Sequence, residues 1–202
     1  MTRTTVSTEA DQHLLNGFVP FPHDRAERYR EAGYWAGKPL ESLLSDAARQ
    51  WPDRTAVVDP SASHTFAQLD QLASEAAAGF AALGIEIGDR VLLQMPNTAD
   101  FAIALFGLLR AGAVPVMCLP AHRRAELSHF ATVSGAVALV IADRFGGFDY
   151  RDMARELVVD HPALRQVIVD GEAGEFTSWT SLFGRAPVPA PTITTAEPAL
   201  LL

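Results

Sequence analysis

The chain has 202 residues, of which 49% are apolar and 20% are charged, a composition typical of a globular protein rather than a disordered one. Its formal net charge of −8 gives no basic surface field, which argues against nucleic-acid and anionic-membrane partners. A single cysteine, Cys118, excludes an internal disulfide and a multi-cysteine metal cluster. The polar start, Met1–Ala10, is unlike a signal peptide, and the longest apolar run, Phe101–Leu109, is shorter than the roughly 20 residues that span a bilayer. We therefore expect a cytoplasmic protein.

Three parts are expected along the chain. Residues 1–39 are irregular and rich in aromatic residues and prolines, which indicates an N-terminal arm with one short helix over Asp24–Ala32. Residues 40–186 are expected to form an α/β subdomain. Residues 187–202 begin with Pro187, Pro189 and Pro191 and are interpreted as a proline-rich segment that leads to a remainder beyond this chain.

From residue 40 onward, helical and strand-like patterns alternate with short connections. Helices are expected where apolar residues recur every three to four positions, and buried strands where short continuous apolar runs follow a turn. In chain order the expected elements are a helix Leu40–Gln50, a strand Thr55–Val58, a helix from an N-cap at Thr65 to Gly84, a strand Val91–Met95, a helix capped by Asn97 or Thr98 and ending near Arg110, a strand Ala113–Leu119, a helix Arg124–Ser134, a strand Val137–Ala142, a helix Asp149–Asp160, a strand Gln166–Val169 and a short helix Trp179–Phe183.

This alternation predicts the fold class. Strand–helix–strand units with short connections favour an α/β domain with a mostly parallel sheet, right-handed crossovers and helices on both faces. At the start of the long helix, Thr65 and Gln68 have the spacing of a capping box, in which each side chain accepts from the other residue's backbone N–H.

General catalytic motifs are absent from the sequence. It contains no Walker A loop, no dinucleotide-binding glycine fingerprint, no nucleophile elbow and no H-E-x-x-H pair. The six histidines are not paired at metal-ligand spacing, and the glycines of Gly171–Gly174 are expected to form a surface turn because acidic residues lie among them. Cys118 is expected to be a small core residue.

One loop is a candidate site. Leu119–Arg123 follows the carboxyl end of a predicted buried strand, and ligands of open parallel sheets bind beyond the carboxyl ends of the strands. His122 and Arg123 are therefore candidates for the rim of a site that binds an acid or a phosphate. The competing structural interpretation, which we favour, is that His122 caps the next helix and Arg123 pairs with a carboxylate such as Glu126.

Three segments resemble the core motifs of the adenylate-forming superfamily, which includes acyl-CoA synthetases, luciferases and nonribosomal peptide adenylation domains. His64–Leu69 resembles the first core motif, usually Thr-Tyr-x-Glu-Leu, with Phe66 and Gln68 as departures. Gly84–Asp89 with Val91–Asn97 resembles a characteristic turn and strand. Leu108–Val116 resembles the second core motif, usually Leu-Lys-Ala-Gly-Ala-x-x-Val-Pro.

Further segments resemble one branch of that superfamily, the aryl-acid ligases of siderophore biosynthesis, which activate 2,3-dihydroxybenzoate or salicylate. The matching segments are Phe18–Pro22, Tyr29–Arg30 with Gly33–Trp35, Leu119–Arg123, Gly147–Arg151 and Val169–Glu172. The resemblance implies that the complete enzyme uses ATP and magnesium to convert an aryl acid into an aryl adenylate. The resemblance also implies that this enzyme then transfers the aryl group to the phosphopantetheine thiol of an aryl carrier protein.

The resemblance carries over no catalytic, cofactor-binding or metal-binding residue. The family's Ser/Thr/Gly-rich phosphate loop, with its lysine, would follow directly after a stretch like Glu197–Leu202. We therefore expect an N-terminal fragment that is inactive by itself and binds no cofactor. Two alternatives remain: a non-catalytic interaction or assembly module built on the same subdomain, and an unrelated α/β domain that binds a small molecule. Whether the reading frame continues into a glycine-rich segment with a lysine separates them from the first hypothesis.

Overall fold

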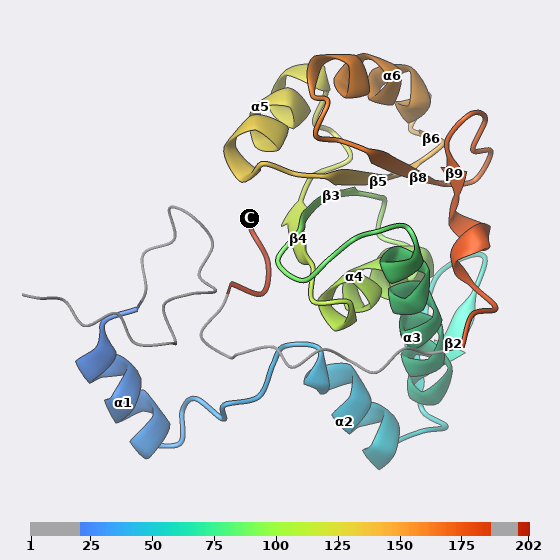
Figure 1. The fold of residues 1–202 in the computed structure, drawn as a ribbon. Coiled ribbons are helices and arrows are strands. Elements are labelled where there is room, and N and C mark those ends of the chain that lie inside the picture. The colour runs from blue at the N-terminus through green and yellow to red at the C-terminus, as the bar shows by residue number, and fades with distance from the viewer. Residues whose placement is uncertain (1–20, 187–197) are drawn as a thin grey trace, which may run out of the picture.

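The structure is a computed structural model that describes residues 21–186 and 198–202 (Figure 1). Part of the expected N-terminal arm, including Phe18–Pro20, and the prolines at positions 187, 189 and 191 lie outside the described residues. The described helices are α1 (His23–Glu31), α2 (Ser42–Gln50), α3 (Phe66–Ala82), α4 (Ala99–Arg110), α5 (Arg124–Ser134), α6 (Tyr150–Asp160) and a 3₁₀-helix η2 (Trp179–Leu182). The described strands are β1 (Thr55–Val58), β2 (Ser63–Thr65), β3 (Arg90–Gln94), β4 (Val114–Met117), β5 (Ala138–Ala142), β6 (Arg144–Phe145), β7 (Phe148–Asp149), β8 (Gln166–Asp170) and β9 (Thr177–Ser178).

A five-stranded parallel sheet with the order β4-β3-β5-β8-β9 is the centre of the fold. β3 and β5 lie in its interior, and every residue of β5 is buried, as expected of an apolar strand run covered on both faces. β4 lies at one edge and contains Pro115, whose missing N–H is tolerated in an edge strand. Leu201 pairs with Val116 in the parallel direction on the outer side of β4.

Helices cover both faces of this sheet, which confirms the predicted fold class. α5 and α6 lie on one face, and α3 and α4 lie on the other (Figure 1). Each face has its own apolar core: Phe80, Leu93 and Ile103 belong to the α3–α4 side, and Leu92 and Leu157 belong to the α5–α6 side. The alternation of Leu92 and Leu93 between the cores follows from the two-residue repeat of a strand.

The predicted helix starts are confirmed in detail. The backbone N–H of Thr65 donates to Gln68 Oε1 at 2.9 Å, and the backbone N–H of Gln68 donates to Thr65 Oγ1 at 3.3 Å, which completes the capping box of α3. Thr98, rather than Asn97, caps α4 by accepting from the N–H of Phe101. None of the described helices is long and apolar enough to cross a membrane.

Several short elements were not predicted. β2 pairs with β1 in a hairpin, β6 and β7 form a second hairpin, and β9 adds the last strand of the main sheet. β6, β7 and β9 have two residues each, too few for a side-chain period to be recognisable. The last helix is a single 3₁₀ turn, and β4 covers only Val114–Met117 of the predicted Ala113–Leu119.

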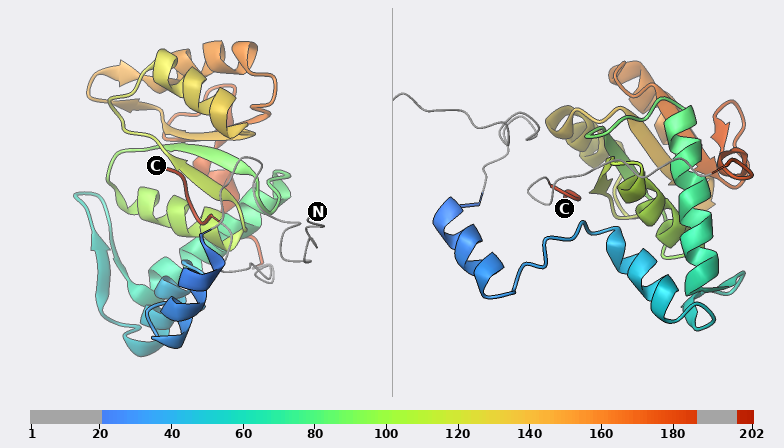
Figure 2. Two further views of the ribbon diagram at one scale, coloured as in Figure 1. Left: turned by 90° about the vertical axis from the view of Figure 1, so that its left-hand side faces the viewer. Right: turned by 60° about the horizontal axis from the view of Figure 1, so that its bottom comes forward.

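α1 and the segment that follows it stand apart from the sheet and its covering helices (Figure 2). Phe21, Tyr29, Tyr34 and Trp35 form a small aromatic cluster there, with ring centroids of Phe21 and Trp35 5.1 Å apart. α1 overlaps the short helix predicted over Asp24–Ala32, but it begins and ends one residue earlier.

Candidate functional site

The carboxyl ends of β3, β4, β5 and β8 meet at one edge of the sheet because these strands are parallel. Gln94 ends β3, the loop Leu119–Arg123 follows β4, Asp143 follows β5, and Asp170 ends β8. This is the edge at which open α/β sheets bind their ligands. We refer to it as the carboxyl edge.

His122 does not cap α5, so that part of the structural interpretation is wrong. The N-cap position of α5 is Arg123. The His122 ring turns back into its own loop, where Nδ1 accepts a hydrogen bond from the backbone N–H of Leu119 at 3.1 Å. The ring edge also packs against Phe130, with centroids 5.2 Å apart. His122 therefore stabilises the loop rather than facing open space.

Arg123 makes contacts within the same loop. Its Nη1 donates to the carbonyl oxygens of Pro120 at 2.7 Å and His122 at 2.8 Å, and its guanidinium carbon lies 4.1 Å from the ring centroid of Phe148. The predicted partner Glu126 does accept a hydrogen bond from Arg123. The donor is the Arg123 backbone N–H, at 2.9 Å, rather than the Arg123 guanidinium. That bond places a carboxylate at the first turn of α5, where the helix dipole favours it.

We expect the Arg123→Ala variant to lower the free energy of unfolding by about 0.5–2 kcal/mol, because it loses two hydrogen bonds to carbonyls and an aromatic contact. The kcat of a complete protein that contains this chain should stay near the wild-type level, because the guanidinium is bonded to carbonyls of its own loop. Urea unfolding and steady-state kinetics on the same preparations provide the measurement. A large fall in turnover with an unchanged unfolding midpoint would instead assign Arg123 to the rim of a ligand site.

Two further side chains bind carbonyl groups of the loop. The Tyr150 hydroxyl donates to the carbonyl of Pro120 at 2.8 Å. The Gln94 carboxamide donates through Nε2 to the carbonyls of Leu119 at 2.9 Å and His122 at 3.0 Å. Neither residue was predicted from the sequence, although a glutamine within the apolar run Val91–Met95 was a usable signal, because a buried polar group requires a partner.

A shallow open hollow of about 380 Å³ lies beside the loop. Its lining residues are Leu119, Pro120, Ala121, Arg123, Phe145, Gly146 and Tyr150. Of the two sequence candidates, Arg123 lines this hollow and His122 does not. Leu119 and Phe145 are 62% and 49% exposed, so the hollow has apolar walls at the protein surface.

Asp143 shapes the other half of the carboxyl edge. Its Oδ2 accepts a hydrogen bond from the backbone N–H of Glu172 at 3.0 Å, which holds the Gly171–Gly174 segment in the expected surface turn. Gly171 has a φ of +109°, and a Cβ at this position would lie 2.4 Å from Asp143 Cγ. Only glycine fits this close approach.

Arg151, which is 6% exposed, joins the start of α6 to that turn. Its Nη2 lies 2.7 Å from Asp149 Oδ2, and its Nη1 donates to the Glu172 carbonyl at 2.7 Å. The hydrogen bonds from Arg151 hold the pKa of Asp149 well below its usual range. This partly buried pair is a structural link, since both charges are engaged with protein groups.

Asp170 has a raised pKa. Burial, together with the negative charges of Asp100, Asp143 and Asp59, raises the pKa of Asp170 from 3.8 to about 6. Because the folded-state pKa is above the unfolded value, ionisation of Asp170 opposes folding. This destabilisation is absent below about pH 4, develops as the pH rises to 6, and is fully present at pH 7.

We therefore expect Asp170→Asn to raise the free energy of unfolding at pH 7 by about 1–2 kcal/mol, a range reduced for partial solvent exposure. The gain should disappear near pH 4. Urea unfolding at several pH values measures the difference between the two proteins. Asp53→Asn, at an exposed position before β1, controls for the loss of one negative charge. A gain that does not depend on pH would contradict the assignment.

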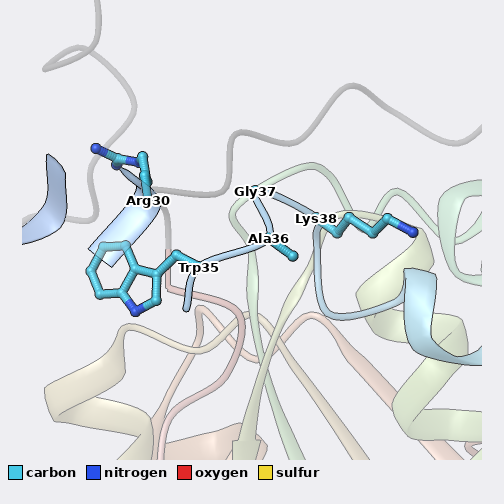
Figure 3. A pocket seen from close by; sticks show the side chains of 5 residues that line it. All are labelled: Arg30, Trp35, Ala36, Gly37 and Lys38. Atoms are coloured by element: carbon cyan, nitrogen blue, oxygen red, sulfur yellow. The ribbon is translucent and has the colours of Figure 1, made fainter. Parts of the chain in front are cut away.

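Lys38 lies outside the carboxyl edge. Its ammonium group is 2.6 Å from Asp46 Oδ2, beside a second hollow of about 220 Å³ lined by Arg30, Trp35, Ala36, Gly37 and Lys38 (Figure 3). The side chains of Arg30 and Lys38 extend in opposite directions there, so the two cations do not converge on one ligand (Figure 3).

Within residues 21–186 and 198–202, no three histidine, cysteine, aspartate or glutamate side chains are grouped so that they could hold a metal ion. Cys118 is buried, and burial raises the pKa of its thiol to about 12. It is the core residue that the sequence predicted.

Comparison with known proteins identifies the family. Residues 44–201 match the family described as AMP-binding enzyme. The chain is 60% identical over 195 residues to a salicyl-AMP ligase / salicyl-S-ArCP synthetase of Mycobacterium tuberculosis, a match that covers 93% of this chain and 34% of that protein. It is 40% identical over 188 residues to a 2,3-dihydroxybenzoate-AMP ligase of Bacillus subtilis, covering 93% of this chain and 35% of the relative.

A solved structure shows the same arrangement. The apo structure of MbtA from Mycobacterium smegmatis superimposes with a TM-score of 0.86 at 61% identity, covering 92% of this chain and 35% of that one. The chain thus spans about a third of the length of the relatives that it matches. The family match extends over most of the described α/β subdomain, so the hypothesis of an unrelated domain is wrong. The chain belongs to the AMP-binding enzyme family.

Proposed function

We propose that this chain is the N-terminal part of a ligase that activates an aryl acid with ATP and transfers the aryl group to the thiol of an aryl carrier protein. Relatives named for salicylate and for 2,3-dihydroxybenzoate match nearly the whole chain, and one is named for vibriobactin, which supports an aryl acid as substrate and siderophore synthesis as the pathway. The higher identity to the salicyl-AMP ligase makes salicylate the first substrate to test.

The observation that carries this proposal is the pairing of Leu201 with the outer edge of β4. The N–H of Leu201 donates to the Pro115 carbonyl at 2.9 Å, and the N–H of Met117 donates to the Leu201 carbonyl at 2.9 Å. Because the pairing is parallel, we infer that polypeptide continuing past Leu202 in the same direction would run beside the end of β4 towards the Leu119–Arg123 loop. We propose that the phosphate loop implied by the resemblance to adenylate-forming enzymes follows at that point of the complete enzyme.

The chemistry explains why a phosphate loop belongs at this edge. A carboxylate becomes a good acyl donor only when one of its oxygens joins a leaving group such as AMP. Departure of pyrophosphate then requires stabilisation of negative charge, which backbone N–H groups, cations and a magnesium ion supply. We propose that the magnesium ligands and the residues that hold ATP come from other parts of the complete enzyme, as the resemblance implies.

The remaining proposals follow from the same family assignment. We propose that the complete enzyme works in the cytoplasm, where ATP is available, and that neither nucleic acid nor membrane is a partner, in keeping with the net charge of −8. We also propose the division into an arm of residues 1–39, a subdomain of residues 40–186 and a connecting segment of residues 187–202.

Two linked measurements test the proposed function. The reading frame downstream of the Leu202 codon is sequenced, and the protein it encodes is assayed for exchange of labelled pyrophosphate into ATP with salicylate, 2,3-dihydroxybenzoate or benzoate. We expect a glycine-rich segment with a lysine, and exchange that depends on a hydroxylated aryl acid. A stop codon directly after Leu202, or a longer protein without aryl-acid-dependent exchange, would overturn the proposal in favour of a non-catalytic module.

A further inference from the structure

Gln94 occupies an unusual position for a glutamine. It is the last residue of β3, an interior strand of the sheet, and it is 1% exposed. It follows Leu92 by two residues, so its side chain points to the same face, into the apolar layer beneath α5 and α6. Gln94 thus places a long polar side chain where the surrounding residues favour an apolar one.

The orientation of its carboxamide is determined by its neighbours. Nε2 faces two carbonyl oxygens, those of Leu119 and His122, and a flipped amide would direct its own oxygen at both of them. The oxygen Oε1 therefore points the other way, and it is buried without a hydrogen-bond partner in the described part of the chain. Leaving an acceptor unsatisfied costs stability, so this position is not optimised for folding alone.

The two bonds from Gln94 belong to a set that turns the loop carbonyls inward. Gln94 engages the carbonyls of Leu119 and His122, Tyr150 engages that of Pro120, and Arg123 binds those of Pro120 and His122 from the loop itself. The end of β3 and the start of α6 thereby fix one loop between them. With its carbonyls held, the loop presents Leu119, which is 62% exposed, to the outer side of the carboxyl edge.

We propose that Gln94 is a positioning residue of the adenylation site: it holds the Leu119–Arg123 loop in the one conformation against which the phosphate-binding segment beyond Leu202 is placed. This inference rests on the proposed function, because it assigns that segment to the neighbourhood of the loop. Gln94 acts through the loop and does not touch the nucleotide. The parallel pairing of Leu201 with Val116 supports the placement, since it directs the following residues along β4 to the loop.

Replacement of Gln94 by methionine separates positioning from folding. Methionine has a similar length and removes the two loop bonds, but it also removes the unsatisfied oxygen and suits an apolar layer. These effects on stability oppose each other, so we expect the melting temperature of Gln94→Met to stay within about 2 °C of the wild type. The carbonyls of Leu119 and His122 then keep only their bonds from within the loop, those donated by the His122 N–H and the Arg123 guanidinium, which loosens the loop.

The first measurement is hydrogen exchange on the 202-residue chain. The N–H of His122 donates to the Leu119 carbonyl at 3.0 Å, and the N–H of Leu119 donates to the ring of His122, so both amides report on the loop. We expect their exchange to become about tenfold faster in Gln94→Met and in Tyr150→Phe. The control is Gln166→Met at the start of β8, away from the carboxyl edge. The Gln166 side chain donates through Nε2 to the Leu83 carbonyl at 3.3 Å, and its replacement should leave the exchange of the Leu119 and His122 backbone amides unchanged.

The second measurement is pyrophosphate exchange by the ligase that contains this chain. We expect Gln94→Met to lower kcat/KM for ATP about tenfold through a higher KM, with the KM for the aryl acid unchanged, because a small displacement of a binding element weakens the contacts it positions. Tyr150→Phe should have a smaller effect of the same kind, and the double variant should lose less than the product of the single effects because both act on one loop. Gln166→Met should have wild-type kinetics.

The outcomes distinguish the two proposals. Unchanged kinetics in Gln94→Met, in a ligase that is active as the wild type, overturns the positioning role. Equal losses for Gln94→Met and Gln166→Met also overturn it, because they indicate general destabilisation. A wild-type protein without exchange activity overturns the proposed function and the kinetic role with it, and hydrogen exchange then decides independently whether Gln94 holds the loop.

Discussion

The 202-residue chain is expected to give no exchange of labelled pyrophosphate into ATP above background, with either salicylate or 2,3-dihydroxybenzoate. Moving an adenylyl group requires cations that neutralise the charge on the departing pyrophosphate. Lys38 is the only lysine in the sequence, and its ammonium group is paired with Asp46 at 2.6 Å in the segment between α1 and α2. It occupies neither the position of the phosphate-loop lysine nor that of the carboxy-terminal lysine that the family resemblance implies.

The carboxyl edge does not compensate for the missing lysines. The Arg123 guanidinium is bonded to two backbone carbonyls. The N-terminus of α4, a potential anion site, is filled by the protein's own carboxylate, because the N–H of Ala99 donates to Asp59 Oδ2 at 2.7 Å. Hydrogen bonds from Ala99 and Ser61 hold the pKa of Asp59 well below its usual range, so this carboxylate is charged at neutral pH.

The assay uses an intact homologue as positive control and Lys38→Ala as the matched variant. Exchange that depends on the aryl acid and disappears in Lys38→Ala would place an adenylation site in this chain and contradict the prediction. Exchange that survives the replacement points to a contaminating enzyme. The relatives that the chain matches are about three times its length.

The fold was predictable from the sequence because its main elements depend on local patterns. A run such as Val91–Met95 is too apolar for an exposed surface and too short for a helix, so it indicates a buried strand. The spacing of Thr65 and Gln68 predicts the start of α3, and their reciprocal hydrogen bonds are present in the structure. Alternation of such signals then leaves a parallel sheet with two helical layers as the remaining arrangement.

The carboxyl edge was less predictable, because its geometry depends on backbone groups. Every non-proline residue has the same carbonyl and N–H, so nothing in Leu119–Arg123 reveals that its carbonyls face Gln94 and Tyr150. The sequence identified the loop by its place after a strand, but the partners of His122 and Arg123 could not be read from it. Arg151 was missed for a similar reason, since its burial depends on Asp149 and on a carbonyl in a distant turn.

Gly79→Ala is expected to destabilise the protein by about 2 kcal/mol, although helix propensity alone predicts a gain of about 1 kcal/mol. Gly79 lies inside α3, where η2 crosses so closely that a Cβ would lie 2.6 Å from Leu182 Cβ and 2.7 Å from its backbone Cα and carbonyl oxygen. Backbone atoms cannot move aside as the end of a flexible side chain can. η2 is also anchored by Trp179, whose Nε1 donates to Asp100 at 2.8 Å, so it cannot shift without cost.

Urea unfolding followed by far-ultraviolet circular dichroism measures this effect, with Ala81→Gly as the matched control. Ala81 lies exposed in the same helix, and its replacement should cost about 1 kcal/mol from propensity alone. If packing against η2 governs Gly79, then both variants are less stable than the wild type even though they change glycine content in opposite directions. A Gly79→Ala variant that is more stable than the wild type would show that η2 moves away freely. In that case the fold would not require the close crossing of α3 and η2.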